Sequence, residues 1–142
     1  MAIANLNETL LHYKMERNRL NLEITQLQAQ KATATYSQAD VQTLKSAETR
    51  ALRSKFKGEF DASAELQEKY KDYTEMPDFE IELDKLTAKF QEQFDELTAW
   101  ETNVDAQITT DSANLEEVNA YMESIKSMLS SNIQEDFNYG LK

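Results

Sequence analysis

The feature that most constrains this chain is an apolar periodicity that runs through its C-terminal half without a helix breaker. From Phe79 to Leu129, apolar residues, Trp100 among them, recur at intervals of three, four or seven positions, which places them on one face of a helix. No Gly or Pro lies between Pro77 and Gly140. An uninterrupted helix over 77–139 would be roughly 90 Å long, so it needs apolar partners along its length.

The N-terminal 35 residues carry a second and stricter periodicity. Its steps alternate between three and four positions, as in the seam of a coiled coil. Two seam positions are charged, Arg17 and Lys31, and we expect both side chains to reach carboxylates of the acidic C-terminal stretch while their aliphatic parts stay packed. The whole seam comprises Ile3, Leu6, Leu10, Tyr13, Arg17, Leu20, Ile24, Leu27, Lys31 and Ala34.

The last part of the chain repeats this heptad over a similar length. One heptad step is skipped between Val104 and Ile108, and the following residues are poor in helix formers. We therefore expect the C-terminal helix to break or kink near 109–114 and its seam to change partner there. Two matched seams at opposite ends predict that the terminal helices pair antiparallel. The second seam comprises Ile108, Asp111, Leu115, Val118, Met122, Ile125, Leu129 and Asn132.

The middle of the chain, 36–76, predicts shorter helices. The Thr- and Ser-containing run 32–37 indicates a boundary, after which a second helix would run from Gln38 to a stop at Gly58. A third helix would begin at Asp61 or Ser63 and end by Tyr73, before Pro77 opens the final helix. A small core is predicted around this turn, formed by Phe56, Phe60, Leu66, Tyr70 and Tyr73.

Together these patterns predict an all-α fold. Gly occurs twice and Pro once, which is too few for the tight turns of a sheet protein. We expect one elongated unit over 1–142, an antiparallel coiled coil or bundle of three to four helices with paired termini. Its parts would be 1–35, 36–76 and 77–142, with 79–104 packed on 41–73.

The net charge of −11 is concentrated on 77–142, which holds four basic and fifteen acidic residues. Such a surface repels nucleic acid and anionic membranes. The middle holds a basic cluster, which we expect to pair with the acids of 78–96 rather than to contact nucleic acid. The cluster comprises Lys45, Arg50, Arg53, Lys55 and Lys57.

No constellation of residues predicts chemistry. His12 is the only His, and with Glu8 it offers too few ligands for a zinc site. The paired carboxylates lack the Glu-x-x-His motifs of a di-iron bundle, and the two Gly residues form no phosphate loop. We therefore predict a non-enzymatic protein with no catalytic residues, no metal site, no cofactor and no small-molecule substrate.

Some apolar residues on the terminal helices lie off the seams. They are candidates for contacts with a protein partner or a second copy of the chain, although an extension of the intramolecular core is the alternative. Ile133 and Phe137 are four positions apart and share one helix face. The candidate interaction residues are Leu11, Leu22, Ile133, Phe137 and Tyr139.

Paired terminal heptads around a variable middle, with no Cys, resemble the terminal helical domains of bacterial flagellin-like and type III secretion filament proteins. The matching segments are Ile3–Ala34 and Val118–Tyr139. This resemblance implies a self-assembling, secreted filament or secretion-apparatus subunit of bacterial origin. The alternative is a cytosolic helical chaperone or adaptor. Prefoldin-like chaperones are similar in length and terminal helices, but their middle should form β-hairpins, whereas 38–75 predicts helix.

The expected cellular compartment depends on sequence features that the chain lacks. The chain has no Cys for disulfides, no apolar run that could span a bilayer, and no charged and apolar leader of the kind that marks a secretory signal peptide. We therefore expect a cytoplasmic protein, or one exported without such a signal.

Overall fold

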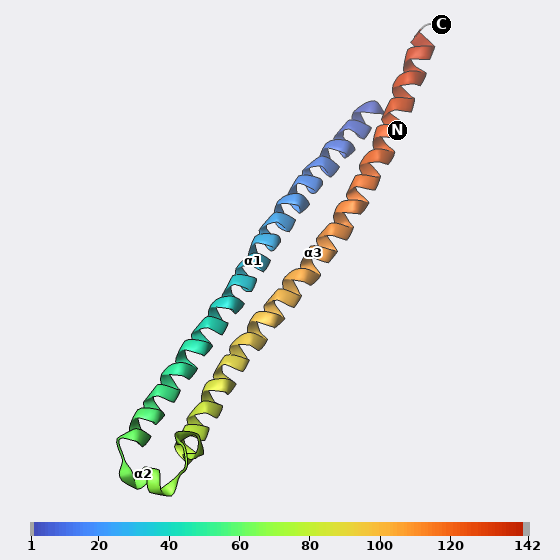
Figure 1. The fold of residues 1–142 in the computed structure, drawn as a ribbon. Helices are drawn as coiled ribbons and strands as arrows, with labels where there is room; N and C mark the ends of the chain where they lie inside the picture. The colour runs from blue at the N-terminus through green and yellow to red at the C-terminus, as the bar shows by residue number, and fades with distance from the viewer. Residues whose placement is uncertain (1, 141–142) are drawn as a thin grey trace. The chain divides into compact units, whose positions relative to one another are not determined.

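The structure is a computed structural model that describes residues 2–140, with the backbone alone for residues 139 and 140. The predicted all-α class is confirmed, since the described residues contain helices and no strand. Two long helices account for most of the chain, and short elements connect them (Figure 1). The elements are α1 (Ile3–Asp61), α2 (Ala64–Lys69), the 3₁₀ turn η1 (Tyr73–Glu75) and α3 (Pro77–Gly140).

Contacts divide the chain into two compact units. Unit 1 combines 1–31 with 103–142, and unit 2 comprises 32–102. Unit 1 has a core drawn from both predicted heptads, which brings the N-terminal and C-terminal seams together. Its buried residues are Leu6, Leu10, Leu20, Val118, Met122 and Ile125, with Tyr13, Leu115 and Leu129 packed against them.

Unit 2 has an aromatic core where the chain turns from α1 to α3. Phe56 and Phe79 meet edge to face with ring centroids 5.5 Å apart, and Tyr73 approaches Phe79 in the same way at 5.2 Å. Edge-to-face rings of this kind gain stability beyond the area they bury. The predicted core at this turn is confirmed. Met76 is also buried there, and Leu52, Phe60, Leu66, Tyr70 and Leu83 pack around it.

The expected helix boundary at 32–37 is wrong, because α1 continues through it to Asp61. Thr and Ser lower helix propensity by only a few tenths of a kcal/mol each. Against this, Ala34 is completely buried on the seam and Leu27 is nearly so, and both would lose that burial if the helix ended here. As a consequence, α1 provides the packing partner of α3 in both units.

The expected break near 109–114 is also absent, because α3 is helical throughout. The hydroxyl of Thr109 donates to the carbonyl oxygen of Asp105 at 3.0 Å, which satisfies it within the helix. The irregular heptad step lies elsewhere. Trp100, placed on the seam by its spacing, is exposed, whereas Glu101 is half-buried in its stead. The seam therefore shifts between Phe90 and Glu101, as an extra four-residue step would cause.

The turn between the long helices uses polar caps. Gly58 does not end α1, since the helix continues three residues beyond it with no positive φ. Ser63 caps α2 by accepting from the backbone N–H of Leu66 at 3.3 Å, and Asp72 caps η1. Pro77 opens α3, followed by acidic residues that suit the positive end of the helix dipole, as predicted.

Candidate functional site

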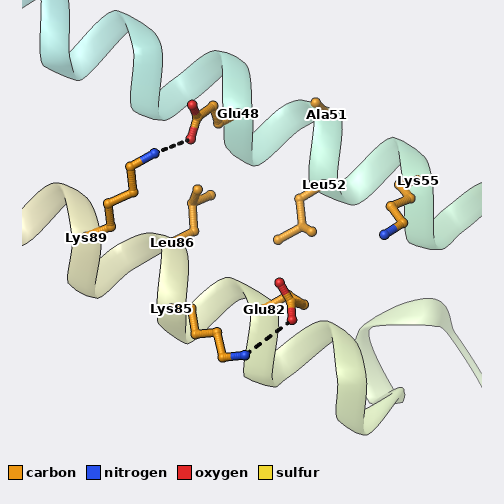
Figure 2. Close-up of a pocket in the computed structure, with 8 residues that line it drawn as sticks. All are labelled: Glu48, Ala51, Leu52, Lys55, Glu82, Lys85, Leu86 and Lys89. Atoms are coloured by element: carbon orange, nitrogen blue, oxygen red, sulfur yellow. Dashed lines mark ion pairs between the residues drawn. The ribbon is translucent and has the colours of Figure 1, made fainter.

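A shallow groove runs between α1 and α3 in unit 2 and is the first candidate for a binding site (Figure 2). Its volume is about 420 Å³. The side chains of Leu52 and Leu86 point into the space between the helices. Charged residues line the remainder: Glu48, Lys55, Glu82, Lys85 and Lys89.

The carboxylates of this groove are already neutralised. Lys89 Nζ lies 3.6 Å from Glu48 Oε2, and Lys85 Nζ lies 3.6 Å from Glu82 Oε1. Lys55 instead lies over the ring of Phe56, 5.6 Å from its centroid. An apolar floor with a rim of paired charges suits the side of another helix better than it suits a reacting small molecule.

Unit 1 has polar networks on its surface. Arg19 pairs with Glu16 and, at 2.9 Å, with Glu23 on the same face of α1. The hydrogen bond from Arg19 lowers the pKa of Glu16, and the same bond raises the pKa of Arg19. These charges are exposed, so the network contributes little to stability.

A tyrosine pair joins α1 to α3 in unit 1. The rings of Tyr13 and Tyr121 stack with centroids 5.5 Å apart. The hydroxyl of Tyr121 donates to Glu117 Oε1 at 2.9 Å, and this bond to a carboxylate raises the pKa of Tyr121 above its usual value. A hydrogen bond of this kind stabilises the protonated form of the Tyr121 hydroxyl.

The charged seam positions have different surroundings. Lys31 Nζ reaches Asp105 Oδ1 at 2.8 Å, as predicted. Arg17 makes no ion pair within the described residues and donates instead to the side chain of Asn18 at 3.4 Å. Asp111 is the buried acid of the seam, and its Oδ2 has no hydrogen-bond partner.

The candidate interaction residues lie on the surface of unit 1. Leu11 and Leu22 are exposed on α1, and Ile133 and Phe137 are exposed on α3. They therefore do not extend the intramolecular core. The side chain of Tyr139 lies outside the described residues.

Expected pairing of the basic cluster with the acids of 78–96 is not found. Within the described chain, the ion pair between these two segments has its acid, Glu48, in 45–57 and its cation, Lys89, in 78–96. The cluster instead lies along α1, where Lys45, Arg50 and Arg53 line one shallow groove. Arg53 lies 5.8 Å from the ring centroid of Phe79, which stabilises its charge without a carboxylate.

Other predicted features can be placed. His12 is exposed, with its ring 5.6 Å from that of Tyr13. Across residues 2–140, no three His, Asp or Glu side chains gather in a way that could hold a metal ion. The helices described here include none with a stretch long and apolar enough to cross a membrane.

Two surface features escaped the sequence analysis. Met15 is exposed and stands in the same column of α1 as Leu11 and Leu22, at spacings of four and seven, which could have been read from the sequence. The sequence also did not predict an acidic groove on α3. Acids occur throughout 77–142, so their positions in the sequence do not show which of them lie together on one exposed surface. It is lined by Ala88, Gln91, Glu92, Asp95, Glu96 and Ala99.

Comparison with protein-family models, with curated proteins and with solved structures finds no match to this chain.

Proposed function

We propose that this chain is a non-enzymatic structural or assembly protein that acts by packing its helices against further copies of itself. The observation that supports this is a line of apolar side chains on the outer surface of α1. Leu11, Met15 and Leu22 are 59%, 64% and 60% exposed. Their spacing places them in one column, so a second helix could cover all three at once.

The C-terminal part of α3 adds two further exposed apolar side chains to the surface of unit 1. Ile133 and Phe137 are 50% and 65% exposed and lie one helical turn apart. Single exposed apolar residues are ordinary, but an aligned set indicates a surface that another chain covers. Covering such side chains would contribute about 25 cal/mol for each Å² of apolar surface removed from water.

Within each unit we infer that α1 and α3 run antiparallel. In unit 1, Tyr13 meets Tyr121 while Lys31 meets Asp105. In unit 2, Gln38 meets Glu101, Glu48 meets Lys89 and Phe56 meets Phe79. The partner's number falls as the α1 number rises, which is the order expected of an antiparallel coiled coil.

Cysteine cross-linking tests the first of these contacts, and the chain has no native Cys to interfere. We expect the double variant Tyr13→Cys with Tyr121→Cys to form an intramolecular cross-link with a short bis-maleimide, seen as a shift on a denaturing gel. The control is Tyr13→Cys with Ala113→Cys, which moves the second thiol about 12 Å along α3. Faster cross-linking in the control than in the test pair would contradict the contact between Tyr13 and Tyr121, on which the antiparallel order in unit 1 rests together with the pair of Lys31 and Asp105.

The setting we propose is a secreted filament or a secretion apparatus, supported by the resemblance of the terminal heptads to flagellin-like and type III secretion filament proteins. A second candidate is a chaperone or adaptor that holds a partner helix. The groove of unit 2 favours it, since Leu52 and Leu86 form an apolar floor between the two long helices (Figure 2).

Self-association is the measurement that separates these candidates. We expect sedimentation velocity over a concentration series to show growth beyond the monomer, and electron microscopy to show whether the product is a filament. Replacing Leu11, Met15, Leu22, Ile133 and Phe137 by Gln removes the apolar surface, and we expect it to weaken assembly at least tenfold.

The matched control is Leu44→Gln with Ile81→Gln, which removes exposed apolar residues from unit 2. Assembly that is lost equally in the control would show that the unit 1 surface has no special role. A wild-type chain that stays monomeric at every concentration would contradict self-assembly, and binding of an amphipathic helical peptide would then support the chaperone or adaptor.

A further inference from the structure

A groove on α1 in unit 2 is lined by three cations that form no ion pair within the described residues. Lys45, Arg50 and Arg53 lie along a shallow groove with a volume of about 420 Å³. The other residues that line this groove, Gln42, Ser46 and Thr49, are uncharged. The six lining residues occupy positions i, i+3, i+4, i+7, i+8 and i+11 of the helix.

These cations have no carboxylate partners within the described residues. Lys45 and Arg50 take part in no ion pair there, and Arg53 contacts the ring of Phe79. The chain as a whole has a net charge of −11, with 26 acidic and 15 basic residues. A basic face kept clear of them is complementary to an acidic surface supplied from outside the molecule.

The chain also carries the complementary surface. On α3, Glu92, Asp95 and Glu96 lie along a groove with a volume of about 600 Å³, flanked by Ala88 and Ala99. The small Ala side chains leave room for another helix to approach closely. Asp95 accepts a hydrogen bond from Gln91 at 3.0 Å, but within residues 2–140 none of the three acids is in an ion pair.

The two grooves share one helical spacing. The acidic groove uses 88, 91, 92, 95, 96 and 99, which is again i, i+3, i+4, i+7, i+8 and i+11. Within that pattern the cations occupy i+3, i+8 and i+11 and the acids occupy i+4, i+7 and i+8. A run of cations about 12 Å long can therefore lie over a run of carboxylates about 6 Å long when two such helices pack side by side. Both surfaces belong to unit 2, so each is complete within one compact part of the chain.

We propose that the basic face of α1, comprising Lys45, Arg50 and Arg53, docks on the acidic face of α3, comprising Glu92, Asp95 and Glu96, of a second copy of this chain. This rests on the proposed self-assembly and names a contact for it that is separate from the apolar surface of unit 1. Because the two faces lie on different helices, every copy can donate one and accept the other. Such contacts either close reciprocally or continue from copy to copy.

Charge reversal with rescue tests this contact. One variant carries Lys45→Glu, Arg50→Glu and Arg53→Glu, and the other carries Glu92→Lys, Asp95→Lys and Glu96→Lys. Alone, we expect each to raise the dissociation constant of self-association roughly tenfold or more, because three attractions become repulsions. Mixed in equal amounts, the two variants should associate with each other, as measured by sedimentation velocity with one of them labelled.

The control has the same change of charge at Lys57, Lys69 and Lys71, which lie outside the groove, and circular dichroism verifies that every variant is helical. Self-association that is equally weak in this control, or unchanged in both groove variants, would overturn the proposed contact while leaving self-assembly through unit 1 in place. A monomeric wild-type chain would overturn both. Restored association in the mixture supports the contact specifically, since general loss of folding cannot be rescued by a partner.

Discussion

Replacing Phe90 by Ala is expected to lower the free energy of unfolding by about 3–5 kcal/mol. Phe90 has a relative exposure of 0% and is among the largest fully buried side chains of the chain. Truncation to Ala loses the burial of the apolar ring. It also leaves a cavity between α1 and α3 that the packed helices close only in part. Urea titration followed by circular dichroism at low protein concentration measures the change.

Phe137→Ala is the matched control, because it removes the same atoms from a side chain that is 65% exposed. We expect it to change stability by about 0.5 kcal/mol or less. Equal losses in the two variants would mean that Phe90 is not packed as the structure shows.

Replacing Asp111 by Leu is expected to act in the opposite direction and to raise the free energy of unfolding by about 1–3 kcal/mol. Asp111 occupies a seam position and is 9% exposed, and its Oδ2 has no hydrogen-bond partner in the structure. A buried carboxylate oxygen without a donor is destabilising because it loses hydration without compensation. Leu has a similar size and suits the apolar neighbours of the seam.

Asp105→Leu is the control for Asp111→Leu. Asp105 is more exposed and pairs with Lys31 at 2.8 Å, so its loss should leave stability unchanged or slightly lower. Thermal melts and urea titration of both variants decide the question. A lower stability of Asp111→Leu would contradict this prediction and would mean that the charge interaction of Asp111 with Arg19 outweighs the cost of its burial.

Features of the fold that depend on neighbouring residues of one helix could be predicted from the sequence, whereas features that depend on packing between distant segments could not. The heptad from Ile3 to Ala34 was correct in its buried positions, because apolar spacing directly reports which helix face excludes water. The predicted helix boundary at 32–37 was wrong, because the burial of Ala34 stabilises the helix by more than the low helix propensities of Thr and Ser destabilise it. Trp100 was misplaced for a related reason, since its spacing allowed two seams and packing selected Glu101.

The candidate surfaces show the same division. Leu11 and Leu22 were identified because they depart from a regular pattern, and their exposure agrees with that departure. The pairing of the basic cluster was mispredicted, since Lys45 and Arg50 have no carboxylate within reach in unit 2. Opposite charges in a sequence do not reveal which side of a helix each will face once the seam is buried.

From sequence alone, this chain had to be helical, with acidic outer faces and two apolar seams, because composition and periodicity act within a few turns of one helix. Tertiary structure decided which segments share a core, that α1 and α3 continue without a break, and which charges remain unpaired. These outcomes depend on contacts between residues such as Tyr13 and Tyr121, which are more than a hundred positions apart. Long-range packing outweighs local preference there, because the burial of a seam exceeds the small helix propensities that oppose it.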